Sequence, residues 1–192
     1  MKGLGLFLAG LVCGAALLLI SGVGEHLRAA LHGMHGGSNT PGAARAHTEE
    51  KFSFTANAPL AEVVPLFGAD KERVWSPGWN PKFIHPLPAA DEEGMVFTVA
   101  HDHLKSVWVN TALDLKNGRI QYLYVIPDAL ATLITLQLKP DGNQTQVEVE
   151  YDRTALSADA DGHVRHLAEG DRTSGPEWEK QVNEYLKKVG SR

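Results

Sequence analysis

The chain has 192 residues, a net charge of −5 and 43% hydrophobic residues, enough for one globular domain of about 140 residues and an additional segment. It contains no run of clustered Lys and Arg, so a nucleic-acid partner, whose phosphates require such cations, is excluded. The only cysteine is Cys13, which excludes a disulfide framework and a cysteine-rich metal site.

Residues 3–24 form an uncharged, leucine-rich run that predicts a membrane span. As a helix rising about 1.5 Å per residue, the run reaches roughly 33 Å, enough to cross a bilayer's hydrocarbon core. A cleaved secretory signal is the alternative, with Gly22-Val23-Gly24 as its cleavage site. We therefore expect residues 1–24 to be a transmembrane anchor or a signal segment. The expected location of the domain is the periplasmic side of a bacterial inner membrane or, after cleavage, outside the cell.

Residues 25–50 indicate a flexible linker, because the glycine-rich stretch 36–42 interrupts all periodicity. His32 and His35 are three residues apart and could share a helix face and a metal ion. No carboxylate or cysteine completes that ligand set, so we expect no metal here.

The folded domain is expected over residues 51–190. Its first strand is Phe52-Ser53-Phe54-Thr55-Ala56, which alternates apolar and polar side chains. A helix follows with Asn57 as its N-cap, and a second short helix is expected at residues 70–74. The buried stripe of the first helix is predicted to be Leu60, Val63, Val64 and Phe67.

The next stretch is Trp75-Ser76-Pro77-Gly78-Trp79-Asn80-Pro81. Its prolines remove backbone donors and fix φ, which excludes a central strand or the middle of a helix, so an ordered loop is predicted. Trp75 and Trp79 must be covered, because exposed rings would form an aggregation-prone patch. They could line the opening of a cavity or fill the core, and the sequence leaves both interpretations open.

Five further strands are predicted, at residues 93–101, 105–113, 119–126, 130–138 and 145–154. The connections are short and rich in turn residues, as in Lys116-Asn117-Gly118, which favours successive antiparallel hairpins. A loop at residues 159–162 and a short helix at residues 164–170 follow. The last helix is capped by Ser174-Gly175-Pro176-Glu177 and is expected to lie on the concave face of the sheet. Its apolar stripe is Trp178, Val182, Tyr185, Leu186 and Val189.

The order of these elements predicts an α+β, helix-grip architecture, a curved antiparallel sheet around a long C-terminal helix. Here the sequence resembles the START-like superfamily, also called SRPBCC or the polyketide-cyclase and birch-allergen group, and in particular its small uncharacterised bacterial members. The resemblance covers about residues 51–189. It rests on the predicted loop at residues 75–81, called the tryptophan loop from here on. It rests also on Trp108-Val109-Asn110-Thr111, Ile120-Gln121-Tyr122, Val125-Ile126-Pro127, Gly142, the run from Thr145 to Tyr151, Thr154-Ala155-Leu156-Ser157, Trp178-Glu179 and Asn183-Glu184-Tyr185-Leu186. It implies binding of a hydrophobic ligand between sheet and helix, although a few such proteins are cyclases, hydratases or chaperone activators.

Several polar motifs are candidates for chemistry. His101-Asp102-His103 places two imidazoles on one strand face, but the simpler interpretation is a polar hairpin tip. His163 and His166 are three apart in a charged segment and carry no stronger signal. We therefore assign no catalytic residue, no metal ligand and no cofactor. The tyrosines are better candidates, because their rings can line a cavity while their hydroxyls orient a ligand.

The sequence thus predicts a membrane-tethered domain that binds a hydrophobic or lipid-like small molecule. The predicted ligand-binding residues are Phe54, Trp75, Trp79, Phe97, Tyr122, Tyr124, Val149, Trp178, Val182 and Tyr185. An enzyme of the cyclase or hydratase type is one alternative, but the inward strand positions are almost all apolar or Tyr, which disfavours an acid or base. A protein-interaction domain is the other, and a tightly packed interior would favour it. The oligomeric state is left open.

Overall fold

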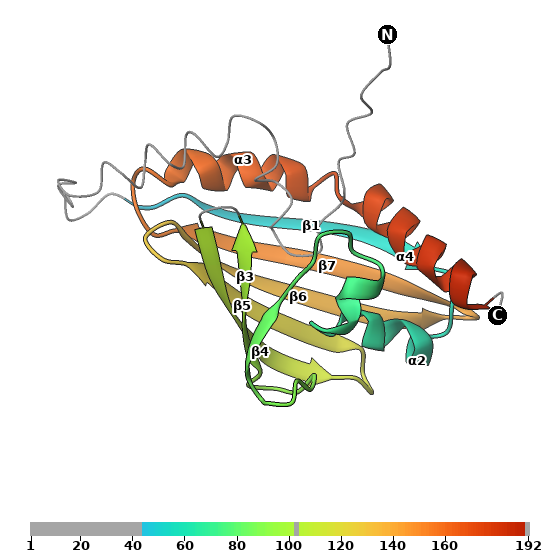
Figure 1. Ribbon diagram of the computed structural model, residues 1–192. Helices are drawn as coiled ribbons and strands as arrows, with labels where there is room; N and C mark the ends of the chain where they lie inside the picture. The colour runs from blue at the N-terminus through green and yellow to red at the C-terminus, as the bar shows by residue number, and fades with distance from the viewer. Residues whose placement is uncertain (1–43, 102–103, 191–192) are drawn as a thin grey trace, which may run out of the picture.

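The computed structural model describes residues 44–101 and 104–190, which form a seven-stranded antiparallel sheet with helices on one side (Figure 1). The strands are β1 (His47–Ala56), β2 (Lys82–His85), β3 (Val96–His101), β4 (Leu104–Asp114), β5 (Arg119–Ile126), β6 (Leu130–Asp141) and β7 (Gln144–Ala155). Their order across the sheet is β1-β7-β6-β5-β4-β3-β2. Strands β2 to β7 are therefore successive antiparallel neighbours, and β1 closes the sheet beside β7, as the short predicted hairpins required.

The helical elements are α2 (Leu60–Val63), the 3-10 turns η2 (Val64–Phe67) and η3 (Lys71–Val74), α3 (Asp161–Asp171) and α4 (Gly175–Gly190). Figure 1 shows α3 and α4 following one another along β1, while α2 and the turns after it lie over another part of the curved sheet. Within the described residues no helix has the length and apolar character needed to span a bilayer. The predicted span and residues 25–43 of the predicted linker lie outside the described ranges.

In β5 and β7 strand periodicity correctly predicted which side chains face the core. In β5 the four inward residues are Ile120, Tyr122, Tyr124 and Ile126, and in β7 they include Val147, Val149 and Tyr151. In β4 the face that carries the β-branched side chains is the outer one, since Val107 is 40% exposed and Trp108 is buried. Gly118, in the predicted turn before β5, has a φ of 67°, and a Cβ there would collide with the carbonyl oxygen of Leu138. Glycine is therefore needed where the turn lies against β6.

The boundaries near the start of the domain differ from prediction. Strand β1 begins at His47 rather than Phe52, because its polar first half also pairs with β7, with Lys51 Nζ lying 3.1 Å from Glu150. The helix predicted after Asn57 begins at Leu60, and from Val64 it continues as a 3-10 turn. Asn57 does not cap it. Its backbone N–H instead donates to Asn183 of α4 at 2.7 Å.

Two further differences concern β2 and α3. Strand β2 was not predicted, since it has four residues between prolines, yet it pairs with β3 at the edge of the sheet. Helix α3 begins at Asp161, inside the predicted loop. Asp161 Oδ1 accepts a 2.7 Å hydrogen bond from the backbone of Ala46, which ties the start of this helix to the start of β1.

Helix α4 is buried along only part of its predicted stripe. Trp178 and Val182 are fully buried, Tyr185 and Leu186 are half-buried, and Val189 is 42% exposed. The strand that α4 contacts most is β1, which lies at an edge of the sheet. The C-terminal helix therefore packs on one side of the inner face, and other elements cover the middle strands.

Candidate functional site

The inner face of the sheet carries two groups of packed aromatic rings. The first surrounds Trp178 of α4, whose ring centroid lies 4.9 Å from that of Phe52, 6.0 Å from Phe54 and 5.9 Å from Trp75. Such edge and tilted contacts are the geometry that aromatic quadrupoles favour. Trp178 thereby joins α4 to β1 and to the tryptophan loop in one apolar cluster.

The second group lies on β3, β4 and β5. The rings of Trp108 and Tyr124 stack at 4.2 Å, and Trp79 approaches Trp108 at 5.6 Å and Phe97 at 5.9 Å. Trp108 Nε1 donates a 2.7 Å hydrogen bond to Ser106 Oγ, so this buried indole has a polar partner on its own strand. The rings of this group contact one another directly.

The tryptophan loop covers both groups. Trp75 and Trp79 are 5% and 6% exposed. Trp75 Nε1 donates to the carbonyl of Leu66, and Trp79 Nε1 to that of Ala69, each at 2.7 Å. Of the two interpretations left open by the sequence, these positions match core packing and not rings lining an opening. A contact between these rings and a ligand stays a prediction.

The ten predicted ligand-binding residues are largely brought together. Nine are buried in one continuous core, namely Phe54, Trp75, Trp79, Phe97, Tyr122, Tyr124, Val149, Trp178 and Val182. Tyr185 is the exception, since it is half-buried at the margin of that core. Tyr122 also has a polar role, because its hydroxyl donates a 3.0 Å hydrogen bond to the carbonyl of Phe67.

A buried polar cluster at the α3 end of the sheet was missed by sequence reasoning. Arg153 of β7 is fully buried, and its Nη2 lies 2.8 Å from Asp171 Oδ2 on α3. Its Nη1 donates to Thr132 Oγ1 at 3.2 Å and to the hydroxyl of Tyr124. The guanidinium also lies 5.2 Å from the ring centre of Tyr151. The inward positions therefore include charged and polar groups, contrary to the prediction that they are almost all apolar or Tyr.

Burial sets the protonation of this cluster. Desolvation raises the pKa of the Tyr124 hydroxyl, so the phenol stays protonated at neutral pH. Desolvation also raises the pKa of Asp171, while the adjacent charge of Arg153 opposes that shift. On α3, burial and the charge of Arg153 lower the pKa of His163 to about 4. The cluster thus supplies buried hydrogen-bond donors from Arg153, whose charge is paired with the Asp171 carboxylate.

Comparison with solved structures identifies this arrangement of sheet and helices. A norcoclaurine synthase point mutant from Thalictrum flavum matches with a TM-score of 0.57 at 10% identity, over 77% of this chain and 99% of that one. A hypothetical protein from Helicobacter pylori matches with a TM-score of 0.58 at 11% identity, over 76% and 90%. These matches show that the chain has a helix-grip fold. The protein XoxI from Bacillus cereus shares the fold at 19% identity and a TM-score of 0.56, over 76% of this chain and 98% of its own. No protein-family model and no curated protein matches the sequence.

The other polar candidates lie outside the interior of this helix-grip domain. Strand β3 ends at His101, which pairs with Leu104 at the start of β4, and the other two residues of the His101-Asp102-His103 motif lie outside the described ranges. On the surface, ligand atoms of His47, Glu49 and Asp152 lie within 4.8 Å of one another. These types of residue can bind a cation, but His47 Nδ1 lies 3.0 Å from Thr154 Oγ1, and such exposed groups alone assign no metal site.

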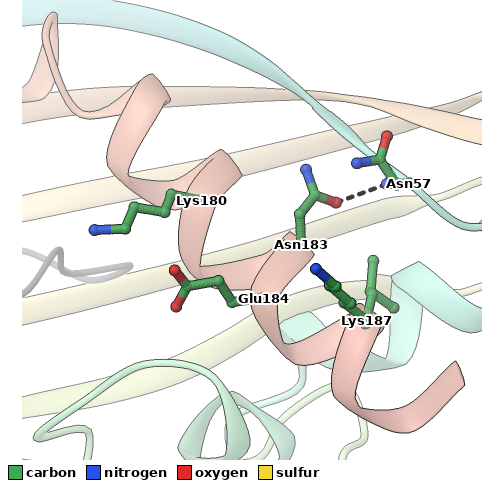
Figure 2. A pocket seen from close by; sticks show the side chains of 6 residues that line it. Asn57, Lys180, Asn183, Glu184 and Lys187 are labelled. Carbon is green, nitrogen blue, oxygen red and sulfur yellow. Dashed lines mark hydrogen bonds between the residues drawn. The ribbon is translucent and has the colours of Figure 1, made fainter. Parts of the chain in front are cut away.

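A surface hollow of about 520 Å³ lies beside α4 (Figure 2). It is lined by Asn57, Lys180, Asn183, Glu184, Leu186 and Lys187. The figure shows Asn183 pointing toward Asn57, with charged side chains around these two residues. Asn183 Oδ1 accepts a hydrogen bond from the backbone N–H of Asn57. None of the ten predicted ligand-binding residues lines this hollow, so it is separate from the aromatic interior.

Proposed function

We propose that this helix-grip domain binds a hydrophobic, lipid-like small molecule between the inner face of its sheet and the segment that covers it. The cover segment is defined as residues 60–79, which comprise α2, η2, η3 and most of the tryptophan loop. The observation that carries the proposal is the aromatic inner face, with Phe97, Trp108, Tyr122 and Tyr124 side by side on three strands. Flat rings on a rigid sheet give an apolar ligand a large contact area at low entropic cost.

The hydrogen bonding of the cover segment supports entry of a ligand beneath it. The two indole N–H groups of the loop donate to carbonyls within the same segment. Two backbone hydrogen bonds, from Glu72 N to Gly68 O and from Ser76 N to Glu72 O, also lie within it, each at 2.9 Å. The bond from Tyr122 to Phe67 joins the segment to β5. The segment can therefore separate from the sheet with its own hydrogen bonds intact, exposing rings that a ligand would then cover.

The proposal includes tethering of the domain at a bilayer through residues 3–24. The support is the uncharged run itself, which has the length of a span. A domain held close to the membrane surface would take up its ligand directly from the lipid.

Native mass spectrometry of the full chain, expressed in cells and extracted mildly, tests the function. The expected result is a bound mass in the range of a lipid or another apolar metabolite, released on denaturation. Protein that is consistently empty, and that does not take up lipids added to it, would contradict ligand binding.

A protein-interaction domain is the second candidate, and the direct ring contacts in the interior favour it. Val74, Ile84 and Leu87 are 47%, 54% and 74% exposed, and they lie on segments joined by the 2.6 Å hydrogen bond from Arg73 Nη2 to the carbonyl of Pro81. These apolar side chains would form part of the interface. The same spectra separate the two functions, because this one predicts a bound polypeptide in place of a small molecule.

A further inference from the structure

Asn110, in the sequence motif Trp108-Val109-Asn110-Thr111, has an unusual environment in β4. Its side chain is fully buried, yet neither Nδ2 nor Oδ1 has a hydrogen-bond partner among the described residues. Its backbone is paired, since its N–H donates to Met95 O and its carbonyl accepts from Gly94 N, each at 2.9 Å. The unpaired groups are therefore confined to the amide side chain.

The position of Asn110 places this amide beneath the cover segment. It shares the inward face of β4 with Trp108 and pairs across the sheet with Tyr122. Trp108 lies against Trp79, and Tyr122 bonds to Phe67, so both neighbours touch the cover segment. The register between β4 and β5 shifts between Asn110 and Ala112, and irregularities of this kind, such as β-bulges, commonly re-aim a side chain next to a binding site.

A second unpaired polar atom lies in the segment above. Ser76 is 2% exposed, and its Oγ has no hydrogen-bond partner in the described part of the chain. Unpaired polar groups therefore occur on the sheet and in the cover segment alike. By contrast Ser106, on the same face of the same strand as Asn110, is fully paired through Val99 O and Trp108 Nε1.

Burying an amide without partners costs free energy, whereas an apolar side chain of the same shape would avoid that cost. The amide is thus available to bind something that comes between the cover segment and the sheet. Arg153 Nε is also unpaired, but its guanidinium is bound to Asp171 beneath α3 and its charge is balanced there.

We propose that Asn110 is the polar anchor of the ligand site, and that it recognises a neutral carboxamide or lactam carried on an apolar, aromatic body. Nδ2 would donate to the ligand carbonyl while Oδ1 accepts the ligand N–H, a planar two-bond pairing that satisfies both buried atoms. A carboxylate fits poorly, because it would bring an unpaired charge into the apolar interior beside Oδ1. This inference rests on the proposed function and specifies the chemical class of its ligand.

The test uses two probes with the same ring system, 2-naphthamide and 2-ethylnaphthalene, titrated calorimetrically into the full chain. The variant Asn110→Leu keeps the branching of the side chain but removes both polar atoms, and the smaller variant Asn110→Val controls for the larger volume of leucine. We expect Asn110→Leu to lower the affinity for 2-naphthamide at least tenfold and to change the affinity for 2-ethylnaphthalene less than twofold. Ser106→Ala is the matched control, which should not alter the ratio of the two affinities.

The outcomes separate the two proposals. If both probes bind and Asn110→Leu affects them equally, ligand binding stands and the anchor is wrong. If neither probe binds the unaltered chain, the anchor is wrong. The proposed function itself fails only if native mass spectra also show no bound small molecule.

Urea denaturation of the ligand-free chain gives an independent readout. Asn110→Leu should raise the midpoint, because no hydrogen bond is lost, while Ser106→Ala should lower it. A lower midpoint for both Asn110→Leu and the smaller Asn110→Val would mean that the amide is already paired within the folded protein, which overturns the proposal.

Discussion

At the scale of single residues, strand alternation identifies which side chains point inward but not what they meet there. The inward series Val147, Val149 and Tyr151 continues to Arg153, so the sequence contained the signal for a buried cation. Its partner Asp171 lies on α3, and which face of that helix docks on β7 depends on tertiary packing. For the same reason the unpaired amide of Asn110 could not be predicted from its motif alone.

His163 should make stability depend on pH. Its pKa is lowered from 6.5 to about 4 in the folded protein by burial and by the charge of Arg153. The unfolded chain therefore binds the proton more tightly, and the stabilisation is complete above pH 6.5 and lost as pH falls toward 4. Allowing for its partial exposure to solvent, we expect a loss of roughly 1–2 kcal/mol over this range, measured by urea denaturation at successive pH values.

The control for this prediction is His166, one turn along the same helix and 45% exposed. His163→Gln should flatten the profile between pH 6.5 and 4, whereas His166→Gln should change it only slightly, because the charge of His166 is the smallest of the three causes that lower the pKa of His163. Equal profiles for His163→Gln and the unaltered chain would show that His163 is not the titrating group.

At the scale of elements, the long alternating strands were predicted well, and the short helix predicted at residues 70–74 is found as the 3-10 turn η3, whereas β2 was missed. Strand β5 has its predicted bounds, because four inward and four outward positions alternate without interruption. Strand β2 lacks such a pattern in its four residues, and the helix after Asn57 changes to a 3-10 turn at Val64. The burial of α4 was overestimated, since periodicity defines an apolar stripe but not how much of it is covered.

The tryptophan loop is expected to behave as core. Trp79→Ala removes a ring that is 6% exposed and contacts Phe97 and Trp108, so the free energy of unfolding should fall by about 3–5 kcal/mol. Val189→Ala, on the exposed end of α4, should cost less than about 0.5 kcal/mol. Chemical denaturation measures both. A loss below about 1 kcal/mol for Trp79→Ala would restore the interpretation that this ring lines an opening.

At the scale of the whole molecule, the order of elements was sufficient to predict the helix-grip fold. The connections between successive strands are too short for parallel crossovers, so the strands must form an antiparallel sheet. The amphipathic helix at the end of the chain then has to cover one side of this sheet. The sequence did not indicate that residues 60–79 would cover the middle strands while α4 packed along β1. Both residues 60–79 and α4 have an apolar surface that can pack on the inner face of the sheet, and the sequence does not show which part of that face each of them covers.

This division of the inner face predicts how the molecule opens. Because the indole bonds of the cover segment end within it, the segment should exchange its backbone hydrogens as one unit, faster than β6 and β7. Tyr122→Phe removes the bond to Phe67 O, worth about 1 kcal/mol, and should speed exchange across residues 60–79 about fivefold while β7 stays unchanged. Hydrogen exchange of the full chain followed by mass spectrometry measures this, with Tyr185→Phe as the control at the margin of the core. If Tyr122→Phe accelerated β5, β6 and β7 to the same extent, the cover segment would not open independently, and a ligand would need another route to the aromatic face.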